Sequence, residues 1–449
     1  MKTKLLLCAT LAFGACQLTP AAFAEYDLYN KDGTKFAFNA DLAVAGFLND
    51  NSWFGQSKSF LGANTDHWWE YGFEPQLSLE TPLGGGSLYG KLSGVYTGTF
   101  GNDASGLTIG LNDPNKLTLE QANIGWKRSG IFPALQDDTF SITLGRQDYN
   151  IGTGFLINDG GGDGGERGGW YIGMRKAFKN AAVARLSSKE LLAEAFYLEN
   201  QPRSGGIEGK IYGGNLEYHF GDKLTLGGTG MVVDPHLPPD LARTVWERLN
   251  TGIDKLDVYS GRATWKPLTQ LTLSGEYAYE TNDQIKADGW YVQAAYETKN
   301  VPLAPVFSYR YAWLGGDDPN TKRLEGFRPI AYGYTDYGTW YQGEITGNYP
   351  LGNSNLNSHM LRAKMKASET VTLNLIYYNF TLDHPSALAS NVTSDKWGDE
   401  VDFITDWQAT KKVYVIGVLG VLFPGKAAEQ WVGGNDNWLY SMLYASYAF

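Results

Sequence analysis

The sequence predicts an all-β protein, a transmembrane antiparallel up-and-down β-barrel of about 18 strands with short periplasmic turns and long extracellular loops. Three observations predict it. Strand-length segments alternate apolar with polar residues, an export signal is followed by no membrane-spanning apolar helix, and both glycine (55 of 449 residues) and aromatic residues (14%) are abundant. Barrel strands show this pattern because one face of each strand meets lipid and the other meets water.

Alternation can be followed along individual segments. Between residues 36 and 46, Phe36, Phe38 and Leu42 share one face, whereas Asn39 and Asp41 fall on the other. Period-two alternation places side chains on opposite faces of a strand. Charged residues at every second position are costly in a packed core and tolerated in a water-filled lumen. The same pattern recurs at residues 69–79, 307–313, 361–366 and 439–449.

The first 24 residues have the features of an export signal. Lys2 and Lys4 precede an apolar stretch, and Ala22-Phe23-Ala24 supplies a cleavage site. We expect residues 1–24 to be removed and residues 25–449 to form a single barrel domain in the outer membrane of a Gram-negative-type cell.

A lipoprotein signal is the less favoured alternative. It would be acylated at Cys16, but Phe13 is bulky where a branched aliphatic residue is expected. Cys8 and Cys16 are the only cysteines, so a mature chain beginning after residue 24 would lack disulfides and thiolate metal sites.

Net charge and apolar runs restrict the function further. The chain carries a net charge of −11, which disfavours nucleic acid as a partner because phosphate backbones would be repelled. The longest later apolar run, residues 413–423, is shorter than the roughly 20 residues that a membrane helix needs. An exported chain of this kind can still cross a membrane as a closed barrel.

Connections fix the expected strand number. We count 19 candidate strands, but exported single-chain barrels have an even number, with short turns and long outer loops in alternation. Eight short turns, as 18 strands require, are expected at residues 82–86, 129–138, 187–190, 220–223, 266–270, 299–303, 366–369 and 410–412. Of the nine outer connections, 148–177 and 314–354 are the longest. The surplus segment, TWYQGEITGNY (339–349), is assigned to the second of these loops as a short hairpin arm.

Three segments resemble the alginate export family of outer-membrane barrels: LGRQDYNIGTGFL (144–156), residues 317–359 and residues 400–425. The resemblance implies an 18-stranded channel for an anionic polyuronate or related solute, with basic residues at a constriction and long loops that gate it. It places Arg146, and less directly Arg310 and Arg362, in the pore. It also implies a monomer whose carboxy-terminal aromatic residue, Phe449, is recognised by the barrel assembly machinery.

Candidate pore-lining residues follow from these positions and from the inward strand faces. They are Arg146, Arg167, Arg175, Arg185, Arg262, Arg310, Arg362, Lys364 and Lys366. Inward faces also carry acids, among them Asp41, Glu70, Glu74, Glu194, Glu217, Glu276, Glu297, Asp402 and Asp406. Either these charges pair across the wall, or a basic patch around Arg310, Arg362, Lys364 and Lys366 attracts carboxylates.

Arg146 departs from the alternation of its segment. Phe140, Ile142 and Leu144 would direct it toward lipid. Two explanations remain open: a bulge at Gly145, or a position above the membrane.

Residues 158–170, NDGGGDGGERGGW, contain seven glycines and cannot hold one regular element. Three interpretations remain open. The segment folds inward as a constriction that lets Arg167 and Arg175 reach solute; it is an ordinary outer loop; or Asp159, Asp163 and Glu166 bind calcium, although their spacing matches no standard calcium loop.

Enzyme chemistry finds little support. Glu217 and His219 share an inward face, but no nucleophile or metal-ligand spacing accompanies them. We expect no catalytic residue, metal or cofactor. Two function classes remain: a channel for anionic saccharides or small carboxylates, and a plugged or structural barrel that binds a periplasmic scaffold. Outer-membrane lipid surrounds the protein in both, and only about ten residues separate the signal from the first strand, which argues against a plug domain.

Overall fold

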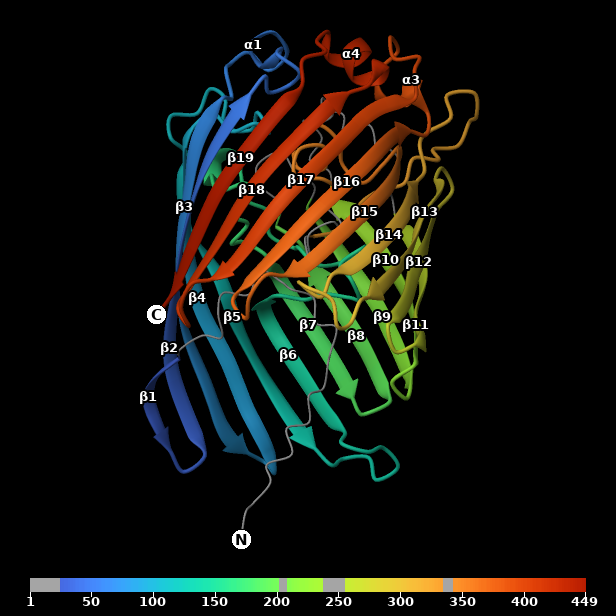
Figure 1. Ribbon diagram of the computed structural model, residues 1–449. Coiled ribbons are helices and arrows are strands. Elements are labelled where there is room, and N and C mark those ends of the chain that lie inside the picture. The colour runs from blue at the N-terminus through green and yellow to red at the C-terminus, as the bar shows by residue number, and fades with distance from the viewer. Residues whose placement is uncertain (1–24, 202–207, 237–254, 334–341) are drawn as a thin grey trace.

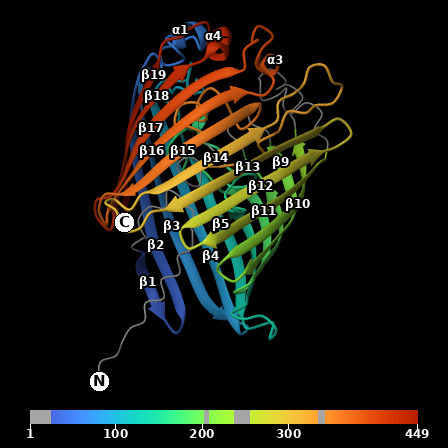
Figure 2. The ribbon, with the colours of Figure 1, turned by 45° about the vertical axis from the view of Figure 1, so that its right-hand side comes forward.

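The computed structural model describes residues 25–201, 208–236, 255–333 and 342–449 as one closed antiparallel barrel (Figures 1 and 2). Consecutive strands from β2 to β19 pair with each other, and β19 pairs with β2 to close the ring. The predicted barrel of 18 strands is confirmed. The predicted signal peptide lies outside the described residues. Among the described residues, no helix is long and apolar enough to cross a membrane.

The barrel strands are β2 (Thr34–Asp50), β3 (His67–Leu83), β4 (Gly86–Gly101), β5 (Asn115–Ser129), β6 (Thr139–Gln147), β7 (Phe178–Ser187), β8 (Leu191–Glu199), β9 (Glu208–Phe220), β10 (Leu224–His236), β11 (Leu256–Leu268), β12 (Leu271–Thr281), β13 (Lys286–Glu297), β14 (Val306–Leu314), β15 (Leu356–Lys366), β16 (Val371–Leu382), β17 (Lys396–Gln408), β18 (Val413–Pro424) and β19 (Trp438–Ala448).

The sheet contains one further strand, β1 (Tyr26–Lys31). It forms a hairpin with the first residues of β2, from Tyr26 opposite Phe38 to Lys31 opposite Thr34. All six of its residues are exposed. In Figure 1 this hairpin lies at the lower left, at the turn end of the barrel. The sequence analysis did not anticipate it.

The connections alternate as predicted. Each of the eight expected short turns joins two paired strands at one end of the barrel. The longer connections lie at the other end, where they carry α1 (Ser57–Phe60), α3 (Pro385–Leu388) and α4 (Lys426–Val432) (Figure 1). One detail is wrong: residues 342–349 form turns rather than an arm of a hairpin.

Side-chain exposure follows the predicted alternation. Leu42, Leu361 and Leu443 are 45%, 54% and 63% exposed on the outer surface. Inward neighbours such as Asn39 and Arg310 are buried. An outer surface with many exposed leucine side chains is unfavourable in water and favourable in hydrocarbon. The outer surface is therefore suited to contact with membrane lipid.

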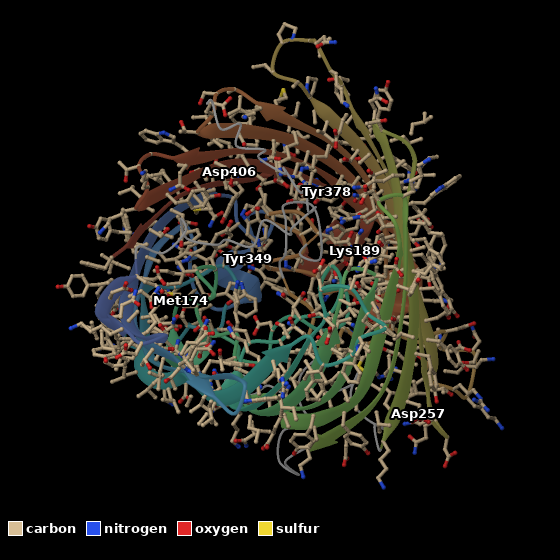
Figure 3. All side chains as sticks on the ribbon, turned by 90° about the horizontal axis from the view of Figure 1, so that it is seen from below. Met174, Lys189, Asp257, Tyr349, Tyr378 and Asp406 are labelled. Atoms are coloured by element: carbon tan, nitrogen blue, oxygen red, sulfur yellow. The ribbon has the colours of Figure 1, made fainter. Side chains whose placement is uncertain are left out.

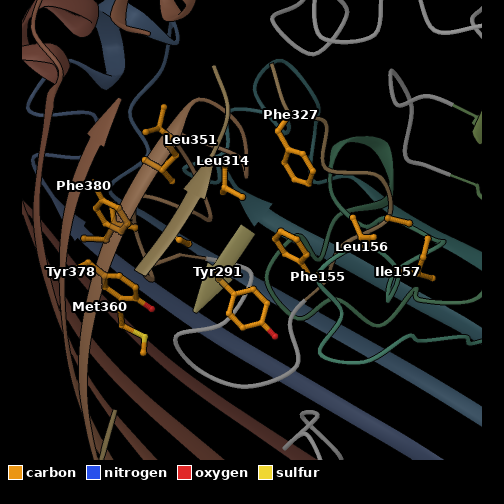
Figure 4. Packing of buried hydrophobic residues seen from close by; sticks show 14 of the residues in the cluster. Phe155, Leu156, Ile157, Tyr291, Leu314, Phe327, Leu351, Met360, Tyr378 and Phe380 are labelled. Carbon is orange, nitrogen blue, oxygen red and sulfur yellow. The ribbon is translucent and has the colours of Figure 1, made fainter. Parts of the chain in front are cut away.

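The interior is partly filled by the two longest loops. Their described residues, 148–177 in the first and 315–333 and 342–355 in the second, fold into the barrel. Phe155 of the first loop stacks on Phe327 of the second with ring centroids 5.7 Å apart, and meets Tyr291 of β13 edge to face at 5.6 Å (Figure 4). These apolar contacts exclude water from one side of the lumen. Both loops therefore belong to the core of the molecule.

Candidate functional site

The two inward loops are joined to each other inside the barrel. Ile157 forms a parallel bridge with Ala331, and the Asn158 amide donates to the Ala331 carbonyl at 2.7 Å. Farther along, the Tyr171 hydroxyl donates to Glu344 Oε2 at 3.0 Å. Seen from the turn end, Met174 and Tyr349, one from each loop, lie within the ring of strands (Figure 3). The two loops therefore contact each other inside the ring of strands.

Wall carboxylates hold these loops through backbone amides. Glu70 of β3 accepts from the amides of Tyr171 and Ile172 at 2.8 and 3.0 Å. Glu120 of β5 accepts from Lys176 and Ala177, both at 2.7 Å. Each carboxyl group accepts two backbone amides, which would otherwise lack a partner in the interior, so these acids anchor the loop 148–177.

The second loop is anchored in the same way. Glu400 of β17 accepts from the amides of Ile345 and Thr346 at 2.7 and 2.9 Å, and Glu280 of β12 accepts from the amide of Arg328 at 3.0 Å. The sequence analysis assigned inward acids to ion pairs or to the pore and missed this role. An inward acid on a strand shows in the sequence, but its loop partner is distant in the chain and leaves no local pattern.

The glycine-rich segment 158–170 lies inside the barrel, as one of the three interpretations expected. Arg167 of this segment and the nearby Arg175 are held by protein groups. Arg175 is 1% exposed, pairs with Asp163 at 2.5 Å and donates to Thr118 Oγ1 at 2.8 Å. Arg167 is 6% exposed and donates to the carbonyls of Gly162 and Gln201. Arg175 therefore braces the loop against the wall instead of reaching solute.

The three acids of the proposed calcium site do not converge. Asp163 pairs with Arg175, Glu166 pairs with Lys116 at 2.7 Å, and Asp159 accepts from the Gly161 amide at 3.0 Å. Burial raises the pKa of Asp159 to about 6. Within the described ranges, no group of three potential ligands is arranged to hold a metal ion.

Arg146 faces inward because of a bulge. The pairing of β6 with β7 shifts register between Gly145 and Gln147, and Gly145 has a φ of +108°. Arg146 Nε donates to the Glu120 carbonyl at 3.0 Å, and an amino group donates to Gln201 at 2.6 Å. Of the two explanations left open by the sequence, the bulge is the one observed.

Two further candidates form ion pairs along the wall. Arg185 of β7 donates to Glu194 of β8 at 2.6 Å. Arg262 of β11 pairs with Glu217 of β9 at 2.6 Å and also contacts Asn215. Ion-pair bracing, one of the two alternatives, describes this part of the wall.

The proposed basic patch is only partly assembled. Arg310 and Arg362 lie diagonally on the paired strands β14 and β15 and are 1% and 9% exposed. Lys364 follows Arg362 on the same strand face. Lys366 instead lies at the short turn, where it pairs with Glu369 at 2.9 Å and its side chain is 55% exposed. We therefore exclude Lys366 from the patch, which we define as Arg310, Arg362 and Lys364.

An acidic strand lies close to this patch. Asn374 of β16 accepts from Arg362 at 2.7 Å and donates to Asp406 of β17 at 2.9 Å. Tyr414 of β18 also donates to Asp406, at 2.6 Å. The positive side chain of Arg362 on β15 and the negative side chain of Asp406 on β17 are thus separated by Asn374 on β16, the strand between them.

A cavity of about 420 Å³ remains between the first strands of the barrel and the two loops. Its lining includes Asp41, Glu74 and Lys91 from the wall and Lys176 and Glu344 from the loops. Burial raises the pKa of the Glu344 carboxyl to about 8. Both signs of charge therefore line this cavity.

Comparison with known proteins supports the assignment of the fold. A model of the alginate export family matches residues 240–437, which confirms the resemblance noted in the sequence over that part of the chain. No match to the chain is found among curated proteins.

Solved structures show the same barrel. OccK5 (OpdH) from Pseudomonas aeruginosa superimposes with a TM-score of 0.55 at 12% identity, over 92% of this chain and 98% of that one. OccK2 (OpdF) from the same organism superimposes with a TM-score of 0.55 at 13% identity, over 92% of this chain and 97% of that one. OccK8 (OprE) superimposes with a TM-score of 0.54 at 12% identity, over 92% of this chain and 98% of that one. With the family match, they place this protein in the outer membrane as a multi-pass barrel and support a channel.

Proposed function

We propose that this protein is a channel that passes anionic saccharides, such as alginate-like polyuronates, or related small carboxylates. The observation that carries the proposal is the patch of Arg310, Arg362 and Lys364 on one inward surface of β14 and β15. Guanidinium groups stay charged even when buried. Placed in a lumen walled by low-dielectric material, they would raise the local concentration of anions.

The match to the alginate export family is the reason for proposing anionic saccharides as the substrate class. The matched residues 240–437 include both arginines of the patch. A polyuronate carries one carboxylate per sugar. Arg310 and Arg362 are 1% and 9% exposed, so they would attract such a chain through their electric field and not through direct hydrogen bonds. The channel would therefore favour chains of carboxylates over neutral sugars of the same size.

Planar-bilayer recording tests the proposal. We expect discrete current steps from the wild-type protein, a preference for anions, and block by oligouronates. Replacing Arg310, Arg362 and Lys364 together with glutamine should lower anion preference about tenfold, the low end of the effect of a focused field on local ion concentration. Lys366→Gln is the matched control, because it removes a lysine from the same strand outside the patch. Unchanged selectivity in the triple variant would refute the role of the patch.

A plugged or structural barrel is the second candidate, and a specific observation favours it. The loops 148–177 and 315–355 are bound to the wall by Glu70, Glu120, Glu280 and Glu400 and to each other. Correctly folded protein that gives no current at any voltage would support this candidate and contradict the channel.

A further inference from the structure

The cavity beside the first barrel strands presents carboxylates and ammonium groups to the same space. Asp41 of β2 and Glu74 of β3 line it from the wall, and Asp148 lines it from the loop 148–177. Lys91 of β4 and Lys176 of the same loop line it as well. This composition differs from the Arg310, Arg362 and Lys364 patch, which belongs to other strands.

Among the described residues, neither Asp41 nor Glu74 forms an ion pair within 4.0 Å, and Lys91 acts on Glu74 only at longer range. Asp41 and Glu74 are directly opposite each other in the pairing of β2 with β3. Asp41 Oδ1 is buried and has no hydrogen-bond partner among the described residues, and Glu74 accepts from the Ser93 hydroxyl at 2.7 Å. Two facing carboxylates repel each other and favour a cation between them.

A deeper carboxylate oxygen reinforces this half of the cavity. The Glu120 side chain is 2% exposed and lines the cavity. Its Oε1 holds the loop amides, whereas its Oε2 has no hydrogen-bond partner in the described part of the chain. Arg146 approaches this oxygen only to 3.8 Å. A buried acceptor without a hydrogen bond is costly, so a donor brought by a ligand would be favoured there.

The basic part of the cavity is also open to a ligand. Within residues 25–201, 208–236, 255–333 and 342–449, neither the Lys91 nor the Lys176 ammonium group lies within 4.0 Å of a carboxylate oxygen. Both influence Asp148 electrostatically at longer range. A ligand carboxylate could therefore pair with either lysine without breaking an existing ion pair.

We propose that this cavity binds a small zwitterionic solute, one that carries an ammonium group and a carboxylate. The ammonium would lie by Asp41 and Glu74 and the carboxylate by Lys91 and Lys176. A simple anion would be repelled by the facing acids, and a simple cation would leave both lysines unpaired. The volume of about 420 Å³ is within the range of small-molecule sites. The proposal concerns equilibrium binding and holds whether or not the barrel conducts anions.

Titration calorimetry on the folded full-length barrel in detergent tests the charge requirement. Three probes share a four-carbon chain: 4-aminobutyrate carries both charges, butyrate carries only the carboxylate, and butylammonium carries only the ammonium. We expect 4-aminobutyrate to bind at least about tenfold more tightly than either single-charge probe, the effect of one charged hydrogen bond. Equal binding by butyrate or butylammonium, or no binding of 4-aminobutyrate, would overturn the proposal.

Variants assign the two halves of the site. Asp41→Asn with Glu74→Gln should weaken 4-aminobutyrate at least about tenfold and leave butyrate no weaker. Lys91→Gln should weaken 4-aminobutyrate and leave butylammonium no weaker. Glu80→Gln is the matched control, since Glu80 pairs with Lys127 near the turn end of the same wall. Heat-modifiable gel migration identifies folded protein. Folded cavity variants that bind 4-aminobutyrate like the wild type would place the site elsewhere.

Discussion

Gly145 determines the direction in which Arg146 points. With a φ of +108°, Gly145 adopts a conformation that side chains rarely tolerate, and a Cβ there would overlap the Ala122 carbonyl oxygen. The sequence revealed the break in alternation and suggested a glycine bulge as one explanation. It did not reveal the partners of Arg146, because the Glu120 carbonyl on β5 and Gln201 after β8 come near it only through strand pairing and folding of the chain.

We expect Gly145→Ala to destabilise the folded barrel by about 1–3 kcal/mol, the usual cost of a strained backbone position. The measurement is the temperature at which the compact gel band of the purified protein converts to the unfolded one, which should fall. Gly261→Ala is the control, because a Cβ at Gly261 meets open space in β11. A fall of the same size in both variants would contradict the special role of the bulge.

Strands and loops differ in how far their sequences determine their positions. Strands such as β3 and β15 show period two within themselves, and their turns are short, so each was predictable from local residues. The loop 315–355 gives no such signal. Its position depends on amides of Ile345 and Thr346 that meet Glu400 on a strand far along the chain, and the expected hairpin arm was wrong for this reason.

The attachment of the second loop to the wall at β17 should depend on pH. Burial raises the pKa of Glu344 from 4.5 to about 8, and the charges of Glu400 and Asp406 act in the same direction. Because the folded value lies above the ordinary one, the stability that the neutral carboxyl contributes is complete below about pH 4.5 and is lost as pH rises through about 8. When ionised, Glu344 would be repelled by Glu400 and Asp406. Two hydrogen bonds would oppose this repulsion: the bond from the Tyr171 hydroxyl to the Glu344 carboxylate, and the bond from the Glu344 backbone amide to Asp402.

Single-channel recording between pH 6 and pH 9 checks this prediction. In the wild type, current fluctuations should increase severalfold on passing pH 8, as the second loop loosens from the wall. Glu344→Gln cannot ionise and should give fluctuations that do not change across that range. The same increase in the variant would assign the pH response to another group.

At the scale of the whole molecule, closure joins the two ends of the described chain. β19 pairs with β2 from Leu439 opposite Asp50 to Ala448 opposite Asp41. The Phe449 amide then donates to the Ala40 carbonyl at 2.9 Å. Parity and alternation predicted the strand number and this seam, because both follow from the need to leave no unpaired edge in lipid. The hairpin of β1 was not predictable in this way, since it lies outside the ring.

Deletion of Phe449 should therefore impair closure more than conduction. The deletion removes the amide bond to Ala40 and the edge-to-face contact of its ring with Tyr447 at 4.7 Å. Its ring is 46% exposed on the lipid-facing side of β19, so the lumen should be unaffected. We expect the folded, heat-modifiable fraction in membranes to fall severalfold, while channels that do assemble keep the wild-type conductance.

Phe423→Ala is the control. It removes a ring that is similarly exposed, 43%, from the outer end of β18, and this variant should assemble normally. A normal folded fraction after deletion of Phe449 would show that the seam does not need this residue, and an altered conductance would show that its effect extends into the lumen.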